Sequence, residues 1–155
     1  MIKKIFIIIL GLSFYSCGFK PVLKSFNISA LNIEEIKYSG PNEMTYMLKN
    51  LLNLNEKAGS KGVFVNLSIT EETLSVTKNS SGITTEQDLI ITININISDN
   101  KKNNLLKDYI SERRRLIVSN NMASDEEIKK IEKNNIIRSL AQKTKFKIQL
   151  AAENK

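Results

Sequence analysis

The stretch 89–98 reads Leu-Ile-Ile-Thr-Ile-Asn-Ile-Asn-Ile-Ser. Every second residue from Leu89 to Ile97 is large and apolar, and the residues between them are mostly polar. Successive side chains of a strand point to opposite faces, so this pattern predicts a β-strand with one buried face and one face left to water or to a wet cavity. A register shift of one residue would expose all five apolar side chains, so we expect the register of this strand to be firmly set.

The flanking segments predict three further strands. Residues 63–76 alternate in the same way and are joined to the central stretch by the turn sequence 78–82, which predicts an antiparallel hairpin. A third member of this meander is expected over 105–118. Earlier in the chain, 28–38 shows a period of two and precedes a Ser-Gly-Pro break, which predicts a first strand.

Two segments predict amphipathic helices. Residues 42–55 carry apolar positions at spacings of three and four, with Asn42 as the expected N-cap. In the second segment, 124–150, Ser124 and Glu127 predict a capping box. The apolar face expected for this helix consists of Ile128, Ile131, Ile137, Leu140, Ala141, Thr144 and Ile148. Its lysines, expected mostly in water, are Lys129, Lys130, Lys133, Lys143, Lys145 and Lys147.

This order of elements predicts the fold class. Strand, helix, three strands and helix give an α+β two-layer sandwich, in which two helices pack on one face of a four-stranded, mostly antiparallel sheet. Residues 28–155 are long enough for one such domain with one core. The other face of the sheet is expected to stay polar and available.

Composition argues against catalysis. The chain has no histidine and one cysteine, which excludes the usual zinc, copper and haem ligand sets and any Ser-His or Cys-His pair. Its six glycines are spread singly and form no phosphate-binding loop. We therefore predict no catalytic residue, no metal site, no cofactor and no enzyme activity. The net charge of +7 accompanies many asparagines and isoleucines, which favours general compositional drift over a nucleic-acid partner.

The first residues predict an export signal, 1–16. Lys3 and Lys4 precede a short apolar run and a polar segment that ends at Ser16, directly before Cys17. A membrane-spanning helix needs about 20 apolar residues, and this run is about half that length. The segment is therefore expected to start translocation without remaining as a helical anchor.

Cys17 is the expected point of attachment to the membrane. The segment 14–17 resembles the bacterial lipobox, in which the signal is cut before a cysteine that becomes acylated, although Phe14 and Tyr15 differ from the usual residues. Each buried methylene contributes about 0.8 kcal/mol, so several acyl chains hold a protein firmly. Residues 17–27 would then form a lipidated tether. The alternatives are a buried free thiol and a conventionally cleaved secretory signal.

The mature chain resembles a known family. It resembles the lipopolysaccharide-assembly lipoprotein LptE family, particularly its alphaproteobacterial branch. The resemblance lies in the order of strands and helices and in three stretches of sequence: Cys17 with 18–21, 84–89 and 108–120. The likeness covers nearly the whole mature chain and consists of diffuse patterns. The run of three arginines at 113–115 is heavier than is usual in that family.

The resemblance implies a role in the outer membrane. It implies a lipid-anchored protein on the periplasmic face that plugs the β-barrel protein LptD and assists the delivery of lipopolysaccharide to the cell surface. The partners would be an LptD-type barrel and lipopolysaccharide, with no nucleic acid. The main alternative is an accessory lipoprotein of a different, ABC-linked envelope lipid-transport system.

Four basic residues are the candidates for contact with lipopolysaccharide or with the barrel lumen. Arginine grips phosphate groups in a bidentate manner, which favours Arg113, Arg114 and Arg115, with Lys107 as a weaker candidate. In an extended segment Arg113 and Arg115 share a face and Arg114 points away. The alternative interpretation is an edge strand whose charges prevent aggregation.

Overall fold

A computed structural model describes residues 32–57, 62–119 and 121–153 of the protein. Three predicted features lie outside these residues, namely the signal segment 1–16, the tether 17–27 with Cys17, and the beginning of the strand 28–38.

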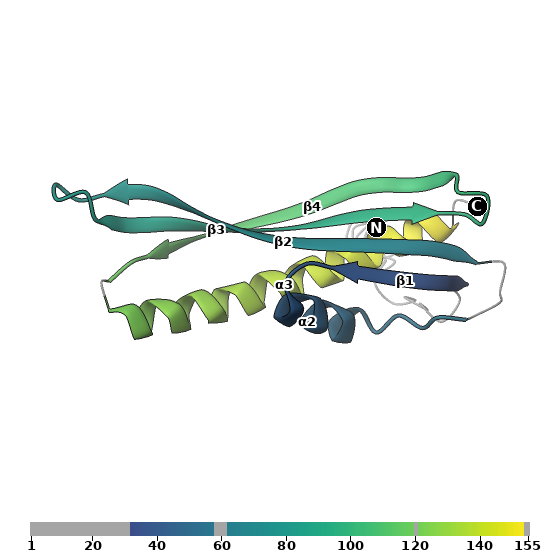
Figure 1. The fold of residues 1–155 in the computed structure, drawn as a ribbon, viewed down its shortest axis with the longest axis horizontal. Coiled ribbons are helices and arrows are strands. Elements are labelled where there is room, and N and C mark those ends of the chain that lie inside the picture. The colour runs from purple at the N-terminus through teal and green to yellow at the C-terminus, as the bar shows by residue number, and fades with distance from the viewer. Residues whose placement is uncertain (1–31, 58–61, 120, 154–155) are drawn as a thin grey trace, which may run out of the picture.

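The described residues form one sheet and two helices. Along the chain the elements are β1 (Ile33–Ser39), α2 (Asn42–Leu52), β2 (Val63–Lys78), β3 (Thr84–Ser98), β4 (Asn104–Ile117) and α3 (Met122–Glu153). The strands lie in the order β1-β2-β3-β4, with β1 parallel to β2 and the other pairs antiparallel. Both helices cover the same face of the sheet (Figure 1). The predicted α+β architecture with two helices on a four-stranded sheet is confirmed.

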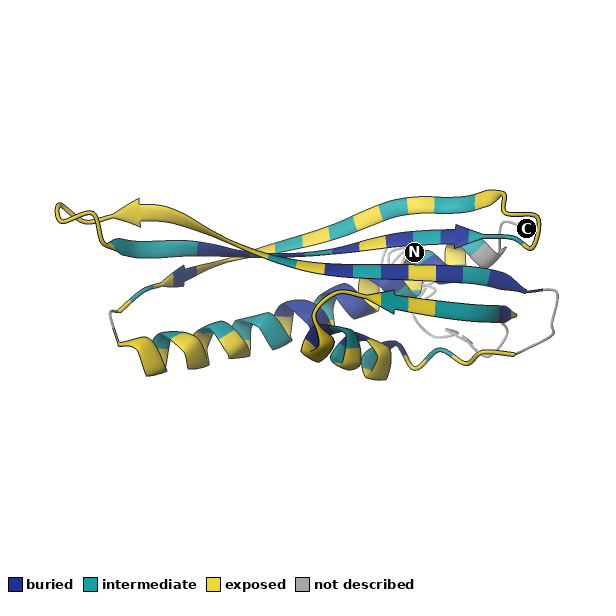
Figure 2. Ribbon diagram, in the orientation of Figure 1, coloured by how far each residue is buried: buried dark blue, intermediate teal, exposed yellow. Residues whose placement is uncertain are grey.

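The core lies between the sheet and the helices, as the alternation in β3 predicts. Every second residue of β3 from Leu89 to Ile97 is at most 2% exposed. Met44, Leu48 and Leu52 of α2 close one part of this core. The remaining cover comes from α3, through Ile136, Ile137, Leu140, Ala141 and Ile148. Figure 2 shows this burial concentrated where both helices lie under the sheet.

Gly40 and Asn53 mark the two ends of the α2 segment. A Cβ atom at Gly40 would lie 2.2 Å from the Ile69 carbonyl oxygen, and its φ of +130° favours glycine. The predicted N-cap at Asn42 is wrong, because Pro41 occupies the cap position and Asn42 is the first helical residue. At the other end Asn53 adopts a left-handed conformation, which ends the helix before the predicted 55.

The start of α3 also differs from the prediction. The helix begins at Met122, and the Asn121 side chain caps it by accepting a hydrogen bond from the Ser124 backbone N–H at 3.4 Å. Ser124 therefore lies inside the first turn, and the predicted capping box is wrong. Asp125 instead accepts hydrogen bonds from the backbone N–H and the hydroxyl of Ser119, which tie the preceding loop to the helix.

The sheet-facing side of α3 is apolar only in its second half. Ile128 and Ile131, predicted to be buried, are 42% and 51% exposed. Lys129 and Lys133, predicted to lie mostly in water, pair with the Glu71 carboxylate of β2 at 3.0 and 2.7 Å. The reason is that the first half of α3 extends past α2 (Figure 1), to a part of the sheet where Glu71 is a sheet partner of Ile91 and so shares the helix-facing side.

Polar contacts also hold α3 against β4. Asp108 pairs with Lys147, Glu112 accepts from Ser139 at 2.7 Å and from Lys143 at 3.0 Å, and Arg114 lies 3.9 Å from Glu132. From 108 to 114 a strand rises about 20 Å. From 132 to 147 a helix rises about 22 Å. The strand segment and the helix segment that carry these contacts therefore match in length, and the contacts fix the position of α3 along β4.

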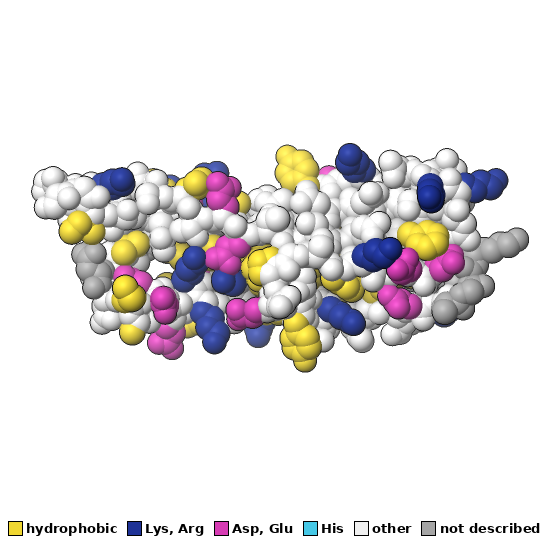
Figure 3. Space-filling model, viewed as in Figure 1, with side chains coloured by type: hydrophobic (Ala, Val, Ile, Leu, Met, Phe, Trp, Pro, Cys, Tyr) yellow, Lys and Arg dark blue, Asp and Glu magenta, His cyan; other side chains and the backbone are white. Residues whose placement is uncertain are grey.

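The first half of α3 and the hairpin end carry mixed charge. Figure 3 shows acidic and basic side chains interspersed at the end of the molecule where these segments lie. None of the helices in the described ranges combines the length and the apolar character that crossing a membrane requires.

We expect Ile93→Ala to lower the free energy of unfolding by about 2–5 kcal/mol, because Ile93 is fully buried in the centre of β3. Ile90→Ala is the matched control, since Ile90 is half-buried on the opposite face of the same strand. It should cost about 1 kcal/mol. Chemical denaturation of both variants measures the difference, and equal losses would contradict the two-faced sheet.

Glu71→Gln should remove part of the acid sensitivity of the fold. Burial acts to raise the pKa of Glu71, but hydrogen bonds and charge from Lys133 and Lys129 outweigh it and hold the pKa below its usual value. The unfolded-state pKa is about 4.3, so the stabilisation is complete above about pH 5 and is lost as pH falls through the lowered folded-state pKa.

We expect Glu71→Gln to lower stability at pH 7 by about 1 kcal/mol and to flatten its decline in acid. The exposed neighbour Glu72 supplies the control variant Glu72→Gln. This variant should leave the stability at pH 7 and its decline in acid nearly unchanged. Urea denaturation between pH 3 and 7 is the measurement. An unchanged acid decline in Glu71→Gln would show that this cluster does not control it.

Candidate binding site on the open sheet face

The face of the sheet that turns away from the helices is built from the other half of each alternating pattern. Because residues directly opposite each other share a face, the strand register arranges these side chains in rows across the sheet. One row consists of Lys37, Asn66, Asn96 and Lys107. The next row consists of Ser39, Ser68, Asn94 and Tyr109.

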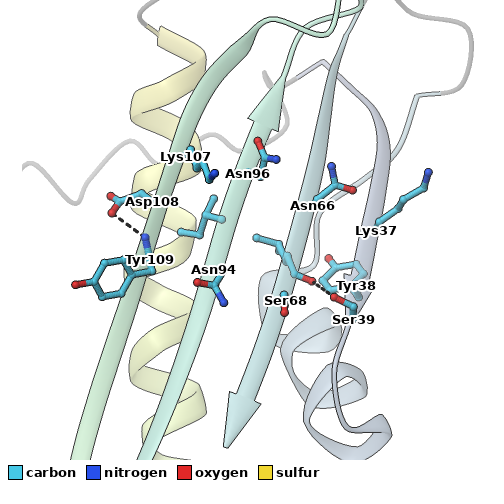
Figure 4. A pocket seen from close by; sticks show the side chains of 12 residues that line it. Lys37, Tyr38, Ser39, Asn66, Ser68, Asn94, Asn96, Lys107, Asp108 and Tyr109 are labelled. Atoms are coloured by element: carbon cyan, nitrogen blue, oxygen red, sulfur yellow. Dashed lines mark hydrogen bonds between the residues drawn. The ribbon is translucent and has the colours of Figure 1, made fainter.

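These two rows line a hollow of about 940 Å³, which we call the polar trough. Figure 4 shows Lys37 and Lys107 at its opposite edges, on β1 and β4, with Asn66 and Asn96 between them. Neighbouring strands lie about 4.8 Å apart, so three spacings separate the backbones of the two lysines by about 14 Å.

The floor of the trough consists of amide and hydroxyl groups. Amides both donate and accept hydrogen bonds, and hydroxyls do the same. The Oδ1 atom of Asn96 is shielded from solvent and has no hydrogen-bond partner among the described residues. An unpaired buried acceptor costs about 1–3 kcal/mol.

Positive charge dominates the edges of the trough. Lys107, the weaker of the predicted site residues, is exposed and has no ion pair within the described chain. Lys37 lies 3.3 Å from Glu35, with both side chains well exposed. Asp108 lines the trough, but its carboxylate pairs with Lys147 of α3 and accepts from the Tyr109 backbone N–H. Hydrogen bonding from Lys147 holds the pKa of Asp108 below its usual value.

Tyr38 of β1 borders the trough, but its sheet partner is the buried Leu67, so its side chain lies on the helix-facing side, half-buried against the core. Burial, with a smaller contribution from the Glu56 carboxylate, raises its pKa to about 12.

The three predicted arginines lie farther along β4 and are held by carboxylates. Arg115 grips Asp88 with two hydrogen bonds of 3.0 and 3.3 Å, and Arg113 lies 3.6 Å from the same carboxylate. Arg115 also lies 3.5 Å from Glu86. The two arginines thus share the open face. Arg113 is six residues from Lys107 along β4, which places it about 20 Å away, and Arg115 lies two residues farther.

Arg114 faces the helix layer. Its guanidinium pairs with Glu112 at 2.9 Å and approaches Glu132 of α3 at 3.9 Å. Burial acts to raise the pKa of Glu112, but Ser139, Lys143 and Arg114 together lower it. In this arrangement Arg114 belongs to the α3–β4 interface, while the ligand contact predicted for Arg113 and Arg115 remains a prediction.

The sequence contains part of the evidence for the trough, but the alternation of apolar and polar residues does not show which polar side chains meet across the sheet. Asn94 and Asn96 stand out on the polar side of the central strand. Their meeting with Lys37 and Lys107 depends on strand pairings between residues far apart in the chain. Among the described residues, no three aspartate, glutamate or cysteine side chains lie together in a way that could hold a metal ion.

Known proteins resemble this chain in structure and not in sequence. No protein-family model and no curated protein matches the sequence. Rare lipoprotein B from Shewanella oneidensis superposes with a TM-score of 0.61 at 14% identity, over 78% of this chain and 98% of that one. A minor lipoprotein from Acinetobacter baumannii gives a TM-score of 0.57 at 14% identity, over 79% of this chain and 92% of that one.

Lipoprotein B from Nitrosomonas europaea gives a TM-score of 0.56 at 13% identity, over 74% of this chain and 81% of that one. At these identities the likeness establishes a shared fold. These three solved structures are bacterial lipoproteins.

The arginine cluster yields a test by titration. The hydrogen bonds from Arg115, with added charge from Arg115 and Arg113, hold the pKa of Asp88 below its usual value. We expect Arg115→Gln to raise that pKa toward the ordinary value of about 3.9. Carbon-detected NMR titration of the carboxylates measures it. The exposed Arg138 of α3 supplies the control Arg138→Gln, and an equal shift in both variants would contradict the pairing.

Proposed function

We propose that this chain is an outer-membrane lipoprotein of the lipopolysaccharide export machinery. In this role it sits in the lumen of an LptD-type β-barrel, plugs it, and assists the delivery of lipopolysaccharide to the cell surface. The role is non-enzymatic and depends on binding and fit.

The observation that carries the proposal is the fold shared with bacterial lipoproteins over most of both chains. In this chain the fold follows an N-terminal sequence that ends its apolar run at Cys17. A lipid anchor on a tether would hold such a domain at a membrane surface without a spanning helix. The two features together support an envelope lipoprotein, and the resemblance of the mature chain to LptE supports the more specific role.

The surface supports a plug. A protein inside a water-filled barrel meets a polar lumen wall, so it should present polar and charged groups on several sides. The open sheet face carries hydroxyl and amide rows, β4 carries arginines and Lys107, and α3 is charged around its first half. All of these side chains can form hydrogen bonds with a polar wall.

The test is co-purification in detergent from the native membrane. We expect an LptD-type barrel protein to be recovered with the tagged full chain in stoichiometric amount. An ABC transporter recovered in place of a barrel would overturn the proposal and favour the alternative transport system. A tagged, unrelated lipoprotein of the same membrane is the control for nonspecific capture.

Cys17→Ala provides a second arm of this experiment. Because the variant lacks the acylated thiol, we expect at least a tenfold loss from the membrane fraction when the barrel is absent, in line with the weak hold of a single or missing acyl chain. Unchanged membrane retention without the barrel would contradict the lipid anchor.

A further inference from the structure

We propose that the outer edge of β4 binds an extended segment of a partner protein, which joins the sheet as a fifth strand antiparallel to β4. In this segment acidic residues alternate with apolar ones. The inference goes beyond the proposed function and does not rest on it, because the edge belongs to the domain itself.

The two edges of the sheet differ. At β1 the chain covers its own edge, since the Ile36 N–H donates to the Glu56 side chain at 2.9 Å and the Lys57 N–H donates to the Ile33 carbonyl at 2.8 Å. On the other side, β4 is the last strand of the described sheet (Figure 1). It contains no proline, and its pairing with β3 is regular over 106–117. Such an edge is a template for a further strand.

The backbone of β4 offers hydrogen bonds along this edge. Residues of an antiparallel strand direct their N–H and C=O groups alternately toward the paired strand and away from it. The Val118 N–H donates to the Thr85 carbonyl of β3 at 2.9 Å, so the odd-numbered residues of β4 point outward. The Tyr109 N–H agrees with this, because it donates to the Asp108 carboxylate at 2.7 Å. The outward N–H groups that lack an acceptor among the described residues include those of Lys107, Ser111, Arg113 and Arg115.

Charges on the helix-facing side of β4 do not block the edge. Asp108 pairs with Lys147, and Glu112 accepts from Lys143 at 3.0 Å. Arg114 lies 2.9 Å from Glu112. These side chains are engaged within the domain, so an added strand would meet no unpaired charge on that side.

The open-face side selects an acidic partner. The outward residues of β4 carry three cations and no carboxylate. Arg115 is held by Asp88, but Arg113 is 64% exposed and lies 3.6 Å from that carboxylate, and Lys107 has no ion pair among the described residues. Directly opposite residues of an antiparallel pair share a face, so acidic residues opposite Lys107 and Arg113 would stabilise the pairing.

The same cations oppose pairing with a second copy. Two β4 edges related by a two-fold axis overlap most fully when the axis passes through Ser111 or Ile110. The first register sets Lys107 opposite Arg115, and the second sets it opposite Arg113. Like charges directly opposite each other are destabilising. The edge is therefore protected against self-association but open to a strand of opposite charge.

The helix layer selects apolar residues on the other side of the added strand. Ser139 and Lys143 of α3 contact β4. Phe146 and Leu150 follow them by seven residues, about two helical turns, so they lie on the same side of α3. Their side chains are 39% and 42% exposed. A hollow of about 230 Å³ lies beside them, lined by Leu105, Leu106, Asp108, Lys147, Leu150 and Ala151. Apolar side chains of an added strand would cover this surface.

The experiment is fluorescence anisotropy of a labelled peptide with the full chain in detergent. The peptide alternates glutamate and valine over about nine residues, enough to pair with 107–115. We expect a peptide with lysine in place of glutamate to bind about tenfold more weakly. The Lys107→Gln, Arg113→Gln double variant should bind the glutamate peptide about three- to tenfold more weakly, and the exposed helix variant Lys130→Gln should bind it unchanged.

Modified backbones test the strand pairing itself. In an antiparallel pair the glutamate N–H groups face β4, so N-methylation of the glutamates should abolish binding, whereas N-methylation of the valines should preserve it. Ser111→Pro removes an outward N–H and keeps the bonds of β4 to β3, so it should weaken binding at least tenfold. Ser111→Ala is its control, because both variants lose the hydroxyl contact with Thr92. The two methylated peptides decide the matter if Ser111→Pro does not fold.

Equal affinities of the two methylated peptides, or no binding of the glutamate peptide, would overturn the proposal. A lysine peptide that binds as tightly as the glutamate peptide would overturn the choice of an acidic partner. Sedimentation of the chain without peptide covers the remaining occupant. A dimer that Ser111→Pro dissociates and Ser111→Ala does not would replace the partner by a second copy.

Discussion

The register of β3 against β2 and β4 determines which side chains meet on each face of the sheet. Leu89 to Ile97 place five large apolar groups against the helices, and this burial forces the intervening polar groups to the open face. The same pairing that builds the core therefore aligns Asn66, Asn96 and Lys107 in one row. A slip of one residue would destroy the core and the polar rows together, so stability and binding surface depend on one alignment.

The helix layer depends on charge as well as on apolar burial. Only the second half of α3 contributes buried apolar residues, and its first half is held by Glu71 with two lysines and by contacts to β4. Such pairs add little where they are exposed, but they specify position, because an uncompensated carboxylate beneath the helix would be costly. The carboxylates Glu71, Asp108 and Glu112 all have lowered pKa values, so this part of the fold weakens in acid before the apolar core does.

The periodicity of the sequence is sufficient to predict the sheet and helix layers, but it does not predict which side chains contact each other. The alternation of 89–97 predicted the central strand, its two faces and the fold class. In α3, isoleucines and lysines occur at similar helical spacings, so only the presence of Glu71 on the sheet reveals that Lys129 and Lys133 face inward. The partner of Arg115 lies 27 residues away, which local patterns do not report. The polar trough was missed for the same reason, since its edges come from β1 and β4.

The open face thus combines two kinds of cation with different chemical freedom. Arg113 and Arg115 stand beside a buried carboxylate that fixes their geometry and cancels part of their charge. Lys37 and Lys107 stand beside neutral amides, and Lys37 also has an exposed ion pair with Glu35. Arginine holds a rigid, planar pair well, whereas lysine is a mobile point charge on a flexible stem. Contacts formed by such mobile groups are of modest strength and can be broken one at a time.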